Sequence, residues 1–225
     1  DYNLDQLSLT GRIQADLGFA TLTSVTGYIK FDRQWSADTD GGPLAQLDFV
    51  TDDRVKQFSQ ELRLSGQSDL VDWLVGGFYS SDHVETSYAG NLSALFNTTS
   101  FTSSDQRSKS GAVFANGEWR LADKLSLITG LRFTTENRTN VGGTTDLVSL
   151  APGSALSTAP FGSPPVPLAV SNAKISDTNW SWKLGLNWKP SPQMLVYASA
   201  TQGIKSGGFF AGVATNSAQL LPYRP

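Results

Sequence analysis

The chain has 225 residues, a formal net charge of -3, 16% charged residues and no cysteine. This length fits one β domain or a piece of a larger one. The composition excludes disulfides and thiolate metal sites, and the lack of a strongly basic balance argues against a nucleic-acid partner.

Hydropathy alone leaves the membrane question open. No stretch approaches the roughly 20 apolar residues that a membrane helix needs. A transmembrane barrel strand, however, shows only about ten residues of alternation and escapes that test. The chain opens at Asp1 without a signal peptide, so we expect a mature, trimmed or internal sequence.

The first half of the chain contains two expected strand pairs with short internal turns. Residues 4–16 and 19–31 form the first pair and turn at Leu17-Gly18. Residues 54–65 and 72–81 form the second pair and turn at residues 66–69. A long polar loop with Asp38 and Asp40 separates the pairs, and another is expected at residues 82–109.

The second half repeats this plan. Residues 110–120 and 124–138 form the third pair, with a tight turn at residues 121–124. The longest loop follows at residues 139–176, and the prolines between residues 159 and 167 predict that no central strand lies there. Residues 178–188 and 194–202 form the last pair, with a turn at residues 189–193, and residues 203–225 read as loop.

The clearest alternation lies in the strand expected at residues 178–188. Successive side chains of a strand point to opposite faces, so small and polar residues share one face and large apolar residues share the other. We call the large apolar residues the Trp row: Trp180, Trp182, Leu184, Leu186 and Trp188. We predict that the Trp row lies on the outer face of a curved sheet, where aromatic residues border a lipid-facing surface.

The whole pattern predicts about eight strands, most of them about ten to thirteen residues long, against an average of about five or six in soluble proteins. Short turns that alternate with long loops are typical of outer-membrane barrels. Three loops above about 12–15 residues would be uncommon in a small compact domain. A soluble β-sandwich or another all-β domain is the alternative.

Two segments resemble the barrel of TonB-dependent outer-membrane receptors: Phe-Ser-Gln-Glu-Leu-Arg-Leu at residues 58–64, and Tyr-Ala-Ser-Ala-Thr-Gln-Gly-Ile-Lys-Ser-Gly-Gly-Phe at residues 197–209. Residues 112–115 and 127–133 also look like strands of this family, in the expected order. The family often has Arg in place of Gln202 and an aromatic residue in place of Ala200. Those departures bear on the ligand and not on membership.

The resemblance implies a 22-stranded barrel around an N-terminal plug, in the outer membrane of a Gram-negative bacterium. Such a receptor imports a scarce nutrient, such as an iron chelate, cobalamin or a glycan, with energy from a TonB-type inner-membrane complex. Residues 1–225 contain no plug-like sequence, no coupling box and no final strand that ends in an aromatic residue. We therefore expect an all-β, antiparallel up-and-down transmembrane β-barrel that is partial, about eight strands of a larger barrel, with no plug domain present.

The implied partners are outer-membrane lipid, the TonB-type complex through the missing plug, and a small-molecule nutrient, with no nucleic acid. A passive outer-membrane porin and a soluble all-β binding domain are the alternatives. We expect no enzyme activity, no cofactor and no metal, and the sequence leaves the substrate-binding residues unknown. His83 is the lone histidine and is placed in a loop beside Asp82 and Glu85, without the partners of a triad or a histidine metal cluster.

Other candidate residues have ordinary structural interpretations. Asp38, Asp40 and Gly41-Gly42 lack the ligand spacing of a calcium loop, so a solvated acidic loop is expected. Gly207-Gly208 lacks the context of a phosphate-binding motif and predicts a bulge or a tight bend. One further set of charged residues is expected on the inward face, where it would pair across strands or touch the plug through water: Glu61, Arg63, Arg132, Glu136 and Lys183. A set of loop aromatics is expected either to hold a substrate at the mouth or to pack through loop collapse: Phe49, Tyr88, Phe96, Phe101 and Phe161.

Overall fold

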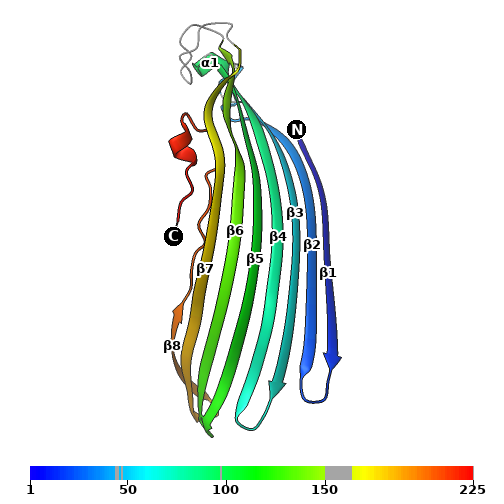
Figure 1. The fold of residues 1–225 in the computed structure, drawn as a ribbon, viewed down its shortest axis with the longest axis vertical. Helices are drawn as coiled ribbons and strands as arrows, with labels where there is room; N and C mark the ends of the chain where they lie inside the picture. Colours follow the sequence, from blue (N-terminus) through cyan, green and yellow to red (C-terminus); the bar gives the residue numbers. More distant parts are fainter. Residues whose placement is uncertain (44–45, 47, 97, 150–163, 225) are drawn as a thin grey trace.

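The expected strand pairs are present as hairpins in the computed structural model, which describes residues 1–43, 46, 48–96, 98–149 and 164–224. Eight strands form one sheet in the order β1 to β8, each antiparallel to its neighbours (Figure 1). This confirms the predicted all-β, up-and-down architecture. The strands are β1 (Tyr2–Asp16), β2 (Thr21–Asp38), β3 (Asp48–Gln67), β4 (Val71–Leu92), β5 (Thr98–Ala122), β6 (Leu125–Ser149), β7 (Val166–Ser191) and β8 (Met194–Gln202).

The register assigns the strand residues to two faces of the sheet. Paired residues project to the same face, and successive residues alternate. Large apolar side chains gather on one face, which we call the apolar face; the other is the polar face. The apolar face carries the Trp row together with Leu7, Leu9, Ile13, Leu22, Tyr28, Phe58, Leu62, Leu64, Val75, Tyr79, Val113, Trp119, Leu125, Leu127, Leu131 and Phe133.

The apolar face is uncovered over the part of the chain that the structure describes. Residues of the Trp row are between 41% and 55% exposed, although a second sheet would bury such a row in a soluble sandwich. Two indole N–H groups on this face have partners: Trp182 donates to Gln202 at 2.6 Å, and Trp119 donates to Thr129 at 2.9 Å. The predicted sharing of one face by the Trp row is confirmed.

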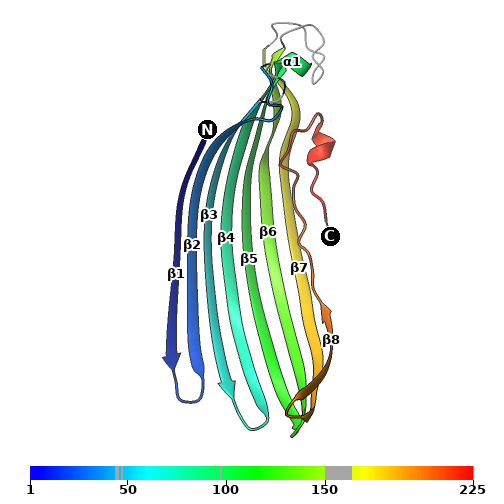
Figure 2. The ribbon, with the colours of Figure 1, turned by 180° about the vertical axis from the view of Figure 1, so that it is seen from behind.

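Short turns and long connections lie at opposite ends of the sheet, as predicted (Figures 1 and 2). The turns at residues 17–20, 68–70, 123–124 and 192–193 lie together at the bottom of Figure 1. The first is closed by a hydrogen bond from Leu17 N to Ala20 O at 2.9 Å, with Gly18 at a φ of 82°. Glycine adopts this left-handed conformation without strain.

The strands are longer than the sequence predicted, and most of two expected loops is sheet. β4 continues to Leu92, a four-residue helix α1 (Ser93–Phe96) follows, and β5 begins at Thr98. Likewise β6 continues to Ser149 and β7 begins at Val166. The polar composition of residues 82–109 and 139–176 indicated loop, but a strand needs backbone pairing and not apolar side chains. A transmembrane strand uses about 9–11 residues, so these strands would extend well beyond a bilayer. We call residues 98–109, 139–149 and 166–176, with their neighbours on β2 to β4, the loop half; the rest is the turn half.

Polar side chains form their own ladder on the polar face of the loop half. Thr102 Oγ1 lies 3.0 Å from Thr144 Oγ1, and Ser104 Oγ donates to Asn140 Oδ1 at 2.6 Å. Thr98 donates to Asp146 in the same row. These residues are buried. Cross-strand Thr and Ser pairs stabilise a sheet, so these polar pairs contribute to the strand pairing of this half.

The proline prediction is wrong at one position. Pro167 lies in β7 and pairs with Thr145 of β6. A register shift between Thr144 and Thr145 accompanies it, since Thr144 pairs with Ala169. Proline lacks a backbone N–H, so a strand tolerates it at such an irregularity.

Residues 203–224 fold back along β7 (Figure 2), and hydrogen bonds to Arg138 and Thr144 hold them over the polar face. Arg138 Nη1 donates to Gly207 O at 2.8 Å, and Ala214 N donates to Thr144 Oγ1 at 3.0 Å. Leu220, in the short 3-10 helix η1 (Ser217–Leu220), packs with Ala169 and Ala214. The segment is irregular apart from η1 and one bridge, as the sequence indicated. Among the described residues, no helix has the length and hydropathy to span a membrane.

Candidate functional site

The charged residues predicted for the inward face do share one face. By the register, Glu61 and Arg63 of β3, Arg132 and Glu136 of β6, and Lys183 of β7 all lie on the polar face. The side chains of this face would line the lumen if the sheet belongs to a barrel. We therefore treat the polar face as the candidate functional site.

Pairing on this face runs along strands more than across them. Arg63 Nη1 lies 3.1 Å from Glu61 Oε1, and Arg138 donates through Nε and Nη2 to Glu136 Oε1 at 2.8 and 2.6 Å. The expected cross-strand pairing is wrong for these two glutamates. Residues i and i+2 share a face, and the arginine side chain is long enough to reach its neighbour on the same strand.

Arg132 is held by aromatic rings. Its guanidinium carbon lies 5.6 Å from the ring centroid of Phe78 and 5.5 Å from that of Phe114, and its Nε donates to Thr134 Oγ1 at 3.1 Å. Both contacts come from strands adjacent in the sheet, β4 and β5. Cation–π contacts of this kind stabilise the guanidinium and fix its direction.

Sequence reasoning missed a cross-strand ion pair at the loop end of β2 and β3. Arg33 Nε donates to Asp53 Oδ2 at 2.9 Å, Nη2 of Arg33 contacts the same oxygen, and Asp53 is 7% exposed. The arginine also lies over the rings of Phe31 and Trp35, at 5.8 and 5.9 Å. The predicted strands ended at residue 31 and began at residue 54, so both charged residues fell in an expected loop, and their polar sequence neighbours gave no strand signal.

The aromatic residues predicted for the loops do not all lie on the same face of the sheet. Phe49 of β3 and Tyr88 of β4 lie on the polar face and pack edge to face, with centroids 5.9 Å apart. Phe101 of β5 lies on the opposite face and is 37% exposed. Phe96 lies in α1, and Phe161 falls outside the described residues. The structure thus brings together one pair of the five.

The glycine pair Gly207-Gly208 permits close packing and makes no bend at the rim. Gly208 forms an antiparallel bridge with Tyr223, with N–O distances of 3.1 and 3.0 Å. A Cβ atom on Gly208 would lie 2.4 Å from the Tyr223 hydroxyl, and one on Gly207 would lie 2.6 Å from the Tyr223 carbonyl oxygen. Glycine is needed here because another segment approaches its backbone.

The acidic turn after β2 uses its carboxylates internally. Asp38 Oδ1 accepts from the backbone N of Asp40 and Gly41 at 3.2 and 2.8 Å, and Asp40 Oδ1 accepts from Gly42 at 2.8 Å. Asp38 and Asp40 are exposed, as expected for a solvated acidic loop.

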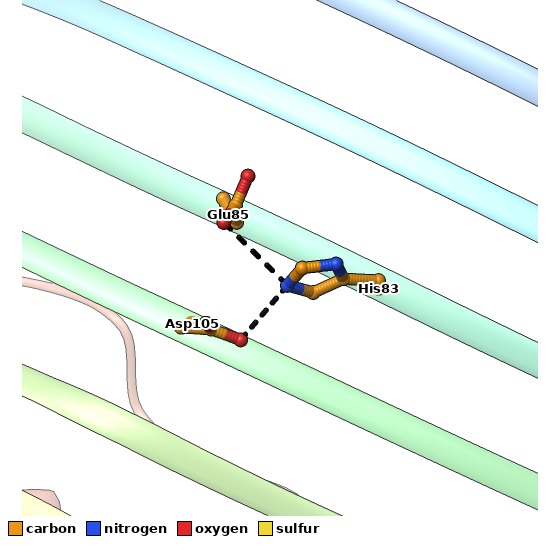
Figure 3. A group of neighbouring side chains, drawn as sticks. All are labelled: His83, Glu85 and Asp105. Atoms are coloured by element: carbon orange, nitrogen blue, oxygen red, sulfur yellow. Dashed lines mark hydrogen bonds and ion pairs between the residues drawn. The ribbon is translucent and has the colours of Figure 1, made fainter.

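His83 lies in β4 and not in a loop, so that expectation is wrong. The register places it with Glu85 and Asp105 on the apolar-face side of the loop half, on the opposite face from Asp82. Figure 3 shows His83, Glu85 and Asp105 as close neighbours. His83 Nε2 lies 2.9 Å from Asp105 Oδ1 and 3.6 Å from Glu85 Oε1. Burial alone would raise the pKa of the Asp105 carboxyl, but hydrogen bonds from Arg107 and His83 outweigh it and lower that pKa.

Comparison with known proteins agrees with this geometry. The family model described as TonB dependent receptor-like, beta-barrel, matches residues 1–223. No curated protein matches the chain. Among solved structures, the chain is similar to the ferric yersiniabactin uptake receptor FyuA from Yersinia pestis, with a TM-score of 0.75 and 16% sequence identity. The match covers 99% of this chain and 31% of that receptor.

The FyuA likeness shows the fold, a sheet that corresponds to part of a receptor barrel. The family match extends over nearly the whole chain. The chain therefore belongs to the TonB-dependent receptor β-barrel family.

Proposed function

We propose that residues 1–225 form part of the barrel wall of an outer-membrane active importer. The apolar face would contact lipid and the polar face would line the lumen. One observation carries this proposal: a single sheet bears an exposed row of Trp and Leu on one side and ion-paired, hydrogen-bonded side chains on the other. That division is the requirement for a strand that separates lipid from an aqueous lumen.

The two edge strands support a wider barrel. β1 and β8 each pair on one side only within the described sheet. Unpaired backbone groups cost several kcal/mol each in hydrocarbon, so further strands must continue the wall in a membrane. We propose that these strands, a plug and the segment that contacts a TonB-type complex are supplied by the rest of the receptor.

The proposed cargo is a scarce nutrient, and the wall itself performs no catalytic step. FyuA is described as an uptake receptor for ferric yersiniabactin, which makes an iron chelate the first candidate to test. Cobalamin and glycans remain alternatives. Gln202, where this family often carries Arg, is a reason to test several chelates and not a single one.

Site-directed labelling tests the assignment of the two faces. These residues contain no cysteine, so Leu184→Cys and Lys183→Cys in the complete receptor introduce probes on opposite faces of one strand. In intact membranes Leu184→Cys should react with a lipid-soluble maleimide, and Lys183→Cys with a small water-soluble one. Equal reaction of both with the water-soluble reagent would contradict the proposal and favour a soluble domain.

Uptake measurements separate active import from a passive porin. Cells that carry the receptor should accumulate the nutrient only when the inner-membrane coupling protein and the proton gradient are present. Uptake that continues unchanged without the coupling protein would favour the porin.

A further inference from the structure

We propose that His83, Glu85 and Asp105 form a binding site for a divalent transition-metal ion such as Zn²⁺. This inference does not depend on the transport role. The site would lie on the outer side of the wall, on the apolar-face side of β4 and β5, beyond the lipid-facing residues. Figure 3 shows its three side chains close together over these two strands.

Two of the three distances between ligand atoms are already close to those that a metal requires. Tetrahedral zinc with bonds of about 2.0–2.2 Å holds its ligand atoms about 3.3 Å apart. His83 Nε2 lies 2.9 Å from Asp105 Oδ1 and 3.6 Å from Glu85 Oε1, which bracket that value. Ligand atoms of all three residues lie within 4.8 Å of one another.

The backbone fixes this arrangement. His83 and Glu85 are two residues apart on β4 and therefore share a face, and Glu85 is the direct register partner of Asp105 on β5. Both strands are hydrogen-bonded on both sides over this region. The backbone of both strands is thus already fixed, so binding of a metal would restrict only the three side chains.

The donor set selects the class of metal. One imidazole nitrogen and two carboxylate oxygens suit zinc and its first-row neighbours. Calcium and magnesium prefer six or more oxygen ligands, so they should bind weakly here. The three side chains are between 30% and 48% exposed, which leaves room for a water ligand in the remaining position.

Neighbouring cations oppose the metal. Arg107 Nε and Nη2 approach the two Asp105 carboxylate oxygens at 3.2 and 3.3 Å, and Lys56 and Arg54 of β3 are the register partners of His83 and Glu85. The Arg107 side chain is 63% exposed. An exposed ion pair contributes only about 0–1 kcal/mol, so a metal can displace the arginine at small cost.

Zinc titration of the complete receptor tests the site. The tag-free protein in detergent, freed of metal by a chelator, is titrated with Zn²⁺ in a buffer without phosphate while heat and Tm are recorded. We expect saturable binding and a rise in Tm, because a ligand that binds the folded state stabilises it. His83→Gln and Asp105→Asn should each weaken this binding by about tenfold or more, since each removes one ligand.

Two further variants sharpen the result. Arg107→Gln should tighten binding, because it removes the competing cation. Asp123→Asn removes an exposed acid from the turn between β5 and β6, at the other end of the sheet, and it should bind as the wild type does. An absence of saturable binding up to millimolar Zn²⁺, or equal affinity in His83→Gln and wild type, would overturn the proposal.

Discussion

The turn half and the loop half of this sheet share one backbone ladder but carry different kinds of side chain. In the turn half, exposed Trp and Leu alternate with polar residues, and one face is ready for lipid. In the loop half, threonine, serine and asparagine pair across strands on the polar face and are covered by residues 203–224. The backbone ladder runs through both halves without a break in topology. Backbone pairing therefore defines the strands in both halves, and the environment of each half determines which side chains the strands carry.

We expect the largest loss of stability from a charge placed on the lipid-facing side of the turn half. Leu184→Arg places a charge on the lipid-facing row and should destabilise the folded receptor by about 2–4 kcal/mol if the position lies near the bilayer midplane. Unfolding by urea in lipid vesicles measures this free energy.

Val170→Arg is the matched control, because Val170 occupies the same face of β7 in the loop half and is 61% exposed. There the new charge would meet water, so the change should stay within about 0.5 kcal/mol. Equal losses in the two variants would contradict the division into halves.

The second-largest loss of stability is expected from breaking the Arg33–Asp53 ion pair on the polar face. Arg33→Met leaves the buried carboxylate of Asp53 without its cation. We expect the free energy of unfolding to fall by about 1–3 kcal/mol, because the desolvation of a buried acceptor is then no longer offset by a partner. The urea midpoint in detergent measures the loss.

Arg54→Met removes an arginine that is 62% exposed and pairs with Asp52 at 3.6 Å. It should cost no more than about 1 kcal/mol. A larger loss for Arg54→Met than for Arg33→Met would refute the ranking.

The third effect concerns the ladder of the loop half. Thr144→Val removes a buried hydroxyl that lies 3.0 Å from Thr102 Oγ1 and accepts from Ala214 N at 3.0 Å. We expect a loss of about 1–2 kcal/mol and faster hydrogen exchange at residues 210–220. Unchanged exchange there would mean that the hydroxyl does not hold this segment.

The smallest effect is local. Gly208→Ala forces the Tyr223 ring away, because its hydroxyl would lie 2.4 Å from the new methyl group. The ring can move, so the global cost should be about 1 kcal/mol, at the low end for overpacking. Protease sensitivity of residues 203–224 should rise, and adding Tyr223→Ala should remove the difference between Gly and Ala at position 208.

The sequence predicted the turn half well. The strict alternation in residues 178–188 and 125–133 assigned faces that the register confirms. The short turns were located within three residues, since Gly18 and the proline-rich Lys189–Gln193 stretch carry local signals. Glu61, Arg63, Arg132, Glu136 and Lys183 were likewise assigned to one face from parity alone.

The same reasoning failed wherever contacts come from distant residues. Arg33 and Asp53 are far apart in sequence and meet through the β2–β3 register, and His83, Glu85 and Asp105 meet through the β4–β5 register. The length of β5 and β6 depended on polar partners that composition could not reveal.

The amino-acid sequence by itself determined the alternation, the turns and the family, because these depend on neighbouring residues and on local backbone preferences. Tertiary structure alone decided how far each strand runs, which charges pair and where residues 203–224 pack. Those outcomes depend on which backbone segments lie opposite each other, and a register of one strand against the next is a property of the sheet and not of either strand.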